Sequence, residues 1–146
     1  MRALVQRVIQ AKVEIHGQLV GSIENGLLVF LGIHKDDLPD TTKWMVNKIV
    51  NLRIFGDDQG KMNRSLKETA GSILIVSQFT LYANCSNGRR PDFFESASGS
   101  VAEAIYDKFV SEIKKEITVV QTGKFGGAMQ VYLVNDGPVT LLVESL

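Results

Sequence analysis

The sequence predicts an α/β fold, a single compact domain in which layers of a mixed β-sheet pack with two main helices. The first reason is the order of its segments, because strands, a helix, strands, a second helix and final strands follow one another along the chain. The second reason is size, since 146 residues with 45% hydrophobic content suit one core. No linker or internal repeat divides the chain, so we expect residues 1–146 to form one domain.

The first half of the chain supplies a hairpin, a buried strand and a helix. Residues 2–15 alternate between apolar and polar and lead through a turn to Leu19–Val20, which predicts an N-terminal hairpin. The continuous apolar run at 26–33 predicts a central strand covered on both faces. Residues 40–52 have helical spacing, and Pro39 suits a first helical turn. We therefore expect a helix over 40–52.

A second buried strand and a second helix follow. Residues 71–77 are rich in Ile and Val and predict the strand. Residues 100–115 predict the helix, because apolar residues recur every four positions on one face. That stripe consists of Val101, Ile105, Phe109 and Ile113.

The C-terminal part of the chain predicts short strands. Residues 117–120, 129–134 and 139–143 have strand character. Between the last two lies Asn135-Asp136-Gly137-Pro138, a run of turn-forming residues. We expect it to form a turn into the final strand. No P-loop or GxGxxG motif accompanies these strands, so a doubly wound nucleotide-binding fold is not indicated.

Composition excludes several classes of protein. Lysine plus arginine and aspartate plus glutamate total 16 each, so no overall basic charge indicates a nucleic-acid partner. Any RNA contact must be local, and Arg89-Arg90 with Lys124 form either a small phosphate-contacting patch or a solvated loop. The single cysteine, the lack of a secretion signal and the lack of a membrane-length apolar run predict a cytoplasmic protein with no membrane contact.

Side chains suited to catalysis by a triad or a metal are scarce. The only imidazoles are those of His16 and His34, which fall in a turn and at a strand end, and we expect neither to be catalytic. Two separated histidines and one loop cysteine do not supply zinc-ligand spacing. We expect no metal and no cofactor.

Two segments remain as candidate sites. Ser77-Gln78-Phe79-Thr80 ends a buried strand, where freed backbone N–H groups can bind the oxygen of an ester carbonyl. On pattern alone, hydroxyls satisfied within the strand are the simpler interpretation. Gly137-Pro138 reads as an ordinary turn unless its bond is cis, in which case two rigid carbonyl oxygens could bind an ammonium group.

Two longer motifs decide between these interpretations. Ser77-Gln78-Phe79-Thr80-Leu81-Tyr82-Ala83 and Asn135-Asp136-Gly137-Pro138-Val139-Thr140 resemble the signature motifs of the D-aminoacyl-tRNA (D-tyrosyl-tRNA) deacylase family. Shorter matching segments, in family order and spacing, lie at 1–3, 6–8, 26–29, 52–55, 60–63, 88–91 and 123–126. The resemblance covers essentially the whole chain and implies the fold of D-Tyr-tRNA deacylases.

The resemblance also implies a site and a partner. It implies a homodimer with active sites at the interface, each combining the Ser77–Thr80 strand end of one subunit with a cis Gly137-Pro138 of the other. The catalytic residues it implies are Ser77, Gln78, Phe79 and Thr80, and the substrate-binding residues are Gly137, Pro138, Phe125, Met129 and Arg7. Phe125 and Met129 would lie near the terminal adenosine. One departure from the family pattern is at Gly127-Ala128.

The implied reaction is hydrolysis of the ester of D-aminoacyl-tRNA, and of glycyl-tRNA mischarged on tRNA(Ala), which releases the free amino acid and tRNA. L-aminoacyl-tRNA would be rejected because its side chain collides with Gly137-Pro138. Backbone groups and the ribose 2'-hydroxyl, rather than a side-chain nucleophile, would carry the chemistry. Two alternatives stay open: a related deacylase that removes L-alanine mischarged on tRNA, and a non-catalytic nucleic-acid-binding protein.

Overall fold

The computed structural model describes residues 1–145 and confirms the α/β fold with a mixed sheet and two main helices. Its elements in chain order are β1 (Arg2–Ile15), β2 (Gln18–Ile23), β3 (Gly26–Gly32), α1 (Thr41–Val50), β4 (Phe55–Gly56), β5 (Met62–Arg64), β6 (Ser72–Ser77), the 3-10 helix η1 (Phe79–Tyr82), α2 (Gly99–Glu116), β7 (Val120–Thr122) and β8 (Gln130–Glu144). The predicted N-terminal hairpin is confirmed as β1 and β2, and the predicted helix over 40–52 as α1.

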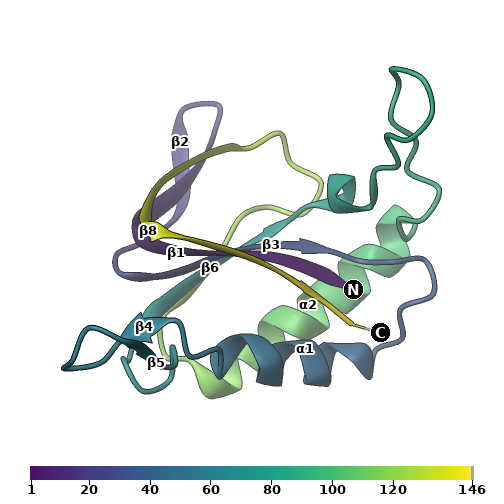
Figure 1. Cartoon of the computed structure of the whole chain (residues 1–146). Coiled ribbons are helices and arrows are strands. Elements are labelled where there is room, and N and C mark those ends of the chain that lie inside the picture. Colours follow the sequence, from purple (N-terminus) through teal and green to yellow (C-terminus); the bar gives the residue numbers. More distant parts are fainter. Residues whose placement is uncertain (146) are drawn as a thin grey trace.

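The main sheet is built around the long strand β1. Its order is β2-β1-β3-β6-β7, and β8 also pairs with β1 (Figure 1). β1 pairs antiparallel with β3 through its first half and with β2 through its second half, while β8 accompanies both halves. β3, β6 and β7 run parallel. At Gly21 of β2 an added Cβ would lie 2.7 Å from the carbonyl oxygen of Thr122 in β7, so the two ends of the sheet approach each other and the sheet curls nearly into a barrel.

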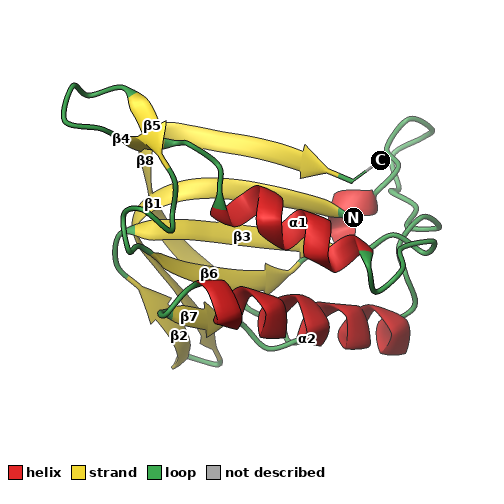
Figure 2. Cartoon of the chain, turned by 90° about the horizontal axis from the view of Figure 1, so that it is seen from below, coloured by secondary structure: helices red, strands yellow, loops and turns green. Residues whose placement is uncertain are grey.

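Two hydrophobic clusters occupy the two faces of the sheet. α1 and α2 cover one face (Figure 2), and Met45, Ile49 and Phe109 pack there, each fully buried. The other cluster lies on the opposite face, where Leu28 of β3 meets Leu74 of β6. Successive residues of β3 point to opposite faces and both faces are covered, which confirms the predicted central buried strand. Each large apolar side chain buried in this way contributes about 1.5–3 kcal/mol.

The second helix agrees with its predicted bounds but not with its full apolar stripe. Ile105, Phe109 and Ile113 are buried against the sheet and α1, whereas Val101 is 47% exposed. Val101 lies in the first turn of α2. Among residues 1–145 no helix has the length and apolar character that a membrane span requires. The strand predicted at 117–120 is wrong, because Ile117 ends the helix and the strand begins only at Val120.

The predicted turn at 135–138 is also wrong, because β8 continues through it as one strand. Val8 of β1 pairs with Asn135 and Gln6 pairs with Thr140, so Arg7 alone stands opposite residues 136–139. Four residues opposite one are three more than regular pairing has, so they form a large, irregular β-bulge that takes backbone groups out of the ladder. We call residues 136–139 the β8 bulge.

Candidate active site

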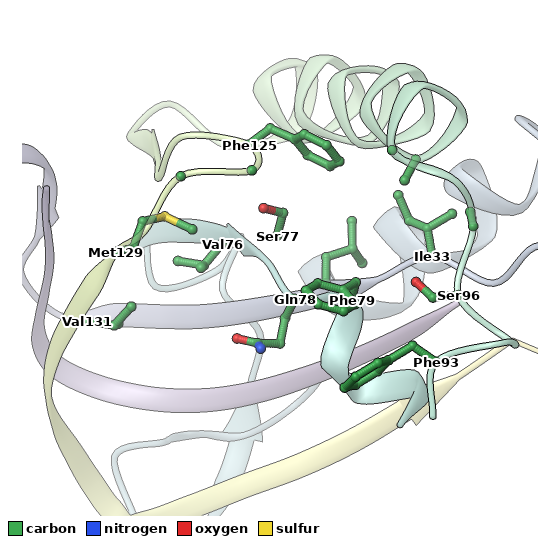
Figure 3. A pocket seen from close by; sticks show the side chains of 16 residues that line it. Ile33, Val76, Ser77, Gln78, Phe79, Phe93, Ser96, Phe125, Met129 and Val131 are labelled. Carbon is green, nitrogen blue, oxygen red and sulfur yellow. The ribbon is translucent and has the colours of Figure 1, made fainter. Parts of the chain in front are cut away.

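A cavity of about 570 Å³ opens where β6 ends. Its floor comes from the ends of β3 and β6, one wall from the segment before α2, and another from the loop between β7 and β8 (Figure 3). The lining residues are Leu31, Ile33, Val76, Ser77, Gln78, Phe79, Phe93, Ser96, Ala97, Gly99, Ala102, Phe125, Gly126, Gly127, Met129 and Val131. We call this cavity the β6 pocket. Most of its lining is apolar, and its polar side chains are those of Ser77, Gln78 and Ser96, a composition typical of small-molecule sites.

The β6 pocket brings together most of the residues that the first signature motif predicts. Ser77 and Gln78 line it from the strand end, and Phe79 lines it from the start of η1. Figure 3 shows the Ser77 side chain between Val76 and Phe125. Thr80 lies just outside the lining, and its hydroxyl accepts a hydrogen bond from Nε2 of Gln78. The motif therefore places one amide and one hydroxyl in the lining of the cavity and a second hydroxyl beside it.

Backbone donors are also free at this point. The amide of Gln78 makes the last bond to the neighbouring strand, donating to the carbonyl of Leu31 at 2.8 Å. The amides of Phe79 and Thr80 begin η1, where a helix has no internal partner for its first N–H groups. Within residues 1–145 neither amide donates to a protein acceptor. Two adjacent free donors are suited to the oxygen of a polarised carbonyl.

Aromatic side chains form two walls of the β6 pocket. Phe79 and Phe93 meet edge to face with ring centroids 5.0 Å apart. On the opposite wall the ring of Phe125 packs on Tyr106 of α2 at 5.7 Å, and the Tyr106 hydroxyl donates to the carbonyl of Ile75 at 2.9 Å. Burial raises the pKa of Tyr106, so this hydroxyl stays protonated and keeps its bond. Phe125 is therefore held against a fixed partner.

The chemistry available in the β6 pocket does not include side-chain acid–base catalysis. Among the described lining residues none has a titratable side chain, because the polar ones are serines and a glutamine. Across residues 1–145 no three His, Cys, Asp or Glu side chains gather as metal ligands do. His34 lies outside this cavity and contacts Glu95, with Nε2 2.8 Å from a carboxylate oxygen. Hydroxyls, an amide and backbone N–H groups are what the cavity offers a substrate.

The second signature motif lies away from the β6 pocket of its own chain. Gly137 and Pro138 are exposed on the β8 bulge and are not among the lining residues. Their peptide bond is cis, as the resemblance implies. Gly137 has a φ of 119°, and an added Cβ would lie 2.9 Å from Cγ2 of Val139, so this position requires glycine.

Arg7 holds the β8 bulge and does not reach the β6 pocket. Its Nε lies 2.9 Å from a carboxylate oxygen of Asp136, an ion pair whose angle is outside hydrogen-bond geometry. Its Nη1 donates to the carbonyl of Ile54. From the other side, Nδ2 of Asn135 donates to the carbonyls of Arg7 and Val139 at 2.8 and 3.0 Å. The bulge is thus fixed at both ends by side chains.

Sequence reasoning missed the wall that precedes α2. Phe93, Ser96 and Ala97 line the β6 pocket, yet they lie in an irregular segment without strand or helix periodicity. The one visible signal was the pair Phe93-Phe94, two adjacent aromatic residues directly after a polar loop. Met129 and Phe125, which the resemblance implied, do line the cavity.

Comparisons with known proteins place the chain in a family. A family model described as D-Tyr-tRNA(Tyr) deacylase matches residues 4–144. A D-aminoacyl-tRNA deacylase of Thermosipho africanus is 57% identical over 145 residues, which is 99% of this chain and 97% of that protein. A D-aminoacyl-tRNA deacylase of Protochlamydia amoebophila is 54% identical over 146 residues, 100% of this chain and 97% of the relative.

Solved structures agree with these sequence matches. The structure of a c-Myc DNA unwinding element binding protein superposes with a TM-score of 0.95 at 40% identity and covers 100% of this chain and 99% of its own. A probable eukaryotic D-amino acid tRNA deacylase has a TM-score of 0.85 at 20% identity, with 97% of each chain covered, and shows the shared fold. With its two signature motifs, its pocket at the end of β6 and a family match over nearly its whole length, this chain belongs to the D-Tyr-tRNA(Tyr) deacylase family.

Proposed function

We propose that this protein is a D-aminoacyl-tRNA deacylase, an enzyme that hydrolyses the ester between a D-amino acid and the end of a tRNA. The observation that carries the proposal is the pair of free backbone amides at Phe79 and Thr80, which adjoin a largely apolar cavity and belong to the family's signature motif. We also propose that residues 1–146 act as one catalytic domain in the cytoplasm, without a metal or cofactor.

The proposed chemistry uses the groups of the β6 pocket where β6 ends and η1 begins. The amides of Phe79 and Thr80 bind the ester carbonyl oxygen and stabilise its negative charge as water adds. The bond between the carbonyl carbon and the ribose oxygen then breaks, and the ribose oxygen leaves as a hydroxyl by taking up the proton that the added water gives up. Gln78 polarises the ester with these amides, and the hydroxyls of Ser77 and Thr80 hold the water and the geometry. The ribose 2'-hydroxyl of the substrate assists in place of a protein base.

Phe125 and Met129 are proposed to contact the terminal adenosine. Both line the β6 pocket opposite the strand end, and Phe125 is held by Tyr106. An aromatic face with an apolar side chain beside it is a suitable surface for a nucleobase.

The active site is proposed to be completed by a second copy of the chain. Gly137 and Pro138 are exposed on the β8 bulge, outside the cavity of their own chain, so they are available to a partner. Within residues 1–145 β8 pairs only with β1, and Tyr132, Val134 and Leu142 along it are 45%, 42% and 54% exposed. An apolar strand with an unpaired edge is a surface that a homodimer would cover.

Chirality is proposed to be determined by exclusion at Gly137-Pro138. The carbonyls of this segment hold the substrate's α-ammonium group, and an L side chain at the adjoining carbon collides with the segment. A D side chain points outward. Glycine has no side chain to exclude, so glycyl-tRNA is also a substrate.

A test of the cross-subunit site combines two defective chains. Gly137→Ala introduces a Cβ where the backbone has a φ of 119° and little space, while Gln78→Ala removes the amide in the β6 pocket. Co-expressed chains form heterodimers with one intact site if the two motifs come from different subunits, so activity returns on mixing. Gly60→Ala, at a glycine with a φ of 76° and no atom within 4 Å of an added Cβ, is the control for backbone strain. An active wild-type monomer in light scattering would contradict the homodimer.

The assay that tests the function compares matched esters. Purified protein should hydrolyse D-Tyr-tRNA, and glycyl-tRNA to a lesser degree, while sparing L-Tyr-tRNA. Equal rates for D-Tyr-tRNA and L-Tyr-tRNA would refute exclusion, and selective cleavage of L-Ala-tRNA would favour the related L-alanine deacylase. Salt-sensitive nucleic-acid binding without hydrolysis of any ester would favour the binding protein, a role suggested by the name of the relative at 40% identity.

A further inference from the structure

Beside the β6 pocket the chain carries a projecting loop with positive charge at its tip. Asn84 and Asp92 close the base of this loop with two backbone hydrogen bonds of 2.9 and 3.1 Å. Figure 1 shows the loop standing away from the body of the molecule, beyond η1. Arg89 and Arg90 are exposed in it, and among residues 1–145 neither forms an ion pair or a side-chain hydrogen bond. Both guanidinium groups are available to a ligand.

Exposed aromatic rings lie at the base of the same loop. Phe79 and Phe93, which line the β6 pocket, are 57% and 37% exposed, and Phe94 is 82% exposed. Phe94 follows Phe93 directly, so its Cα is about 3.8 Å from that of a pocket residue. A single exposed apolar side chain is ordinary, but three aromatic rings at the edge of a cavity indicate a surface that binds something.

The backbone that carries Phe94 is fixed on both sides. Before it, the amide of Phe94 donates to a carboxylate oxygen of Asp92 at 3.4 Å. After it, the carbonyl of Glu95 accepts from the amide of Lys35 at 3.0 Å, and the carbonyl of Phe93 accepts from the amide of Ser96 at 3.0 Å. The ring is exposed, yet its attachment point is held. Binding a flat partner there requires little ordering of the protein.

The charges near Phe94 favour an anionic partner. The Glu95 carboxylate lies 2.9 Å from Nζ of Lys35, whose positive charge offsets its own, and 2.8 Å from Nε2 of His34. The Asp92 carboxylate faces the Phe94 amide. Arg89 and Arg90 therefore leave this side of the pocket with unpaired positive charge beside exposed rings. Aromatic rings that stack on bases, together with cations that contact phosphates, characterise single-stranded nucleic-acid sites.

We propose that Phe94, Arg89 and Arg90 bind the unpaired nucleotides that precede the terminal adenosine of the substrate tRNA, the ring stacking on a base and the guanidinium groups contacting phosphates. The inference rests on the proposed function, because it takes the β6 pocket as the site of the esterified adenosine. The preceding nucleotides would then leave past the pocket wall formed by Phe79 and Phe93, where Phe94 adjoins that wall and Arg89 and Arg90 lie on the loop that projects beside it.

The first experiment compares the whole tRNA substrate with its esterified terminal adenosine alone. Phe94→Ala should lower kcat/KM for D-Tyr-tRNA by about 5- to 150-fold, mainly through KM, which is the range for removal of one base–aromatic stack. The D-tyrosyl ester of adenosine alone should be hydrolysed as by the wild type. Phe94→Tyr should restore activity on D-Tyr-tRNA. Leu38→Ala, at an apolar residue that is 68% exposed and lines no part of the β6 pocket, is the matched control. Equal decreases on both substrates would overturn the proposal, because the ring would then support the pocket itself.

The second experiment does not depend on hydrolysis. Uncharged tRNA should bind the wild type more tightly than the same tRNA trimmed of its unpaired 3' nucleotides, and Phe94→Ala should abolish that difference. Arg89→Ala with Arg90→Ala should flatten the dependence of log Kd on log salt by about 0.7 for each phosphate that these side chains neutralise in the wild type. If the wild type shows these binding differences but cleaves no ester, the proposed function fails and this inference stands. Unchanged binding by Phe94→Ala would refute the inference. A change in the oligomeric state of this variant would also refute it and would assign the ring to a protein interface.

Discussion

Replacing Arg7 with lysine tests whether the β8 bulge needs a guanidinium to hold it. Arg7 stands alone opposite residues 136–139, and its side chain, only 15% exposed, reaches both the Ile54 carbonyl and Asp136. Lysine keeps the charge but has a single ammonium group, which cannot replace a planar guanidinium group that contacts two acceptors at once. The variant can therefore keep only one of these two interactions.

The size of the effect follows from the burial of each interaction. A hydrogen bond from a charged donor to the Ile54 carbonyl contributes about 1.5–3 kcal/mol, whereas the ion pair with Asp136, whose side chain is 46% exposed, contributes at most about 1 kcal/mol. Arg7→Lys should therefore lower stability by about 1–2 kcal/mol. For a chain of this length each kcal/mol corresponds to a fall in Tm of about 4 °C.

Activity should fall further than stability explains. A displacement of about 1 Å in a substrate-positioning group costs on the order of 100-fold in rate, so kcat for D-Tyr-tRNA should drop by about 10- to 100-fold at a temperature where the variant is folded. Arg53→Lys is the control, because Arg53 also contacts two acceptors, both on Asn63, but is exposed and remote from the bulge. A variant with reduced Tm and wild-type kcat would show that Arg7 stabilises the fold without positioning Gly137-Pro138.

Further outcomes test the site and its supports. Thr80→Ala should retain substantial hydrolysis, because backbone amides rather than this hydroxyl act on the ester; a fall in activity by a factor of about a million, typical of a deleted nucleophile, or an acyl-enzyme trapped at Thr80 would refute this. Tyr106→Phe should lower the free energy of unfolding by about 1 kcal/mol, measured in denaturant, because the hydrogen bond to the Ile75 carbonyl is lost. It should also raise KM, because Phe125 is held less firmly. An unchanged KM would show that Tyr106 stabilises the fold without positioning Phe125. Burial raises the pKa of Tyr82 to about 12 from an unfolded value near 10, so the unfolded chain ionises first and stability should fall as pH rises from about 10 to about 12. Tyr82→Phe should flatten part of this decline, and an identical pH profile would contradict the assignment.

The local sequence pattern was sufficient to predict an element wherever its periodicity matched the burial of its residues. The apolar run at 26–33 predicted a covered strand, which is β3, and the residues at 105, 109 and 113 form one buried face of α2. The strand end at Ser77 was also predictable, because polar residues follow a continuous apolar run there. Features of this kind depend on neighbours a few residues away, which a sequence shows directly.

Features that depend on distant pairing were not predictable. Asn135-Asp136-Gly137-Pro138 has the composition of a turn, yet β1 pairs with β8 on both sides of it and makes it a bulge. Nothing near these residues indicates that Asn135 will pair with Val8 and Thr140 with Gln6. The wall at Phe93 and Ser96 was missed for a similar reason, since an irregular segment becomes part of a cavity only through tertiary contacts. Whole-length family resemblance, rather than pattern, indicated Phe125 and Met129.

The pairing of β1 with β8 has a consequence for how the chain folds during synthesis. Arg2 pairs with Glu144 and Glu14 with Gln130, so the first strand to be made is completed by the last. At about 5–20 residues per second a ribosome adds the intervening residues in roughly 6 to 30 s. Throughout that interval one edge of β1 has no native partner, and contacts of such long range form late and slowly. The nascent chain therefore passes through a stage in which a 14-residue strand with an open edge can pair wrongly, and this stage is where chaperone protection would matter most.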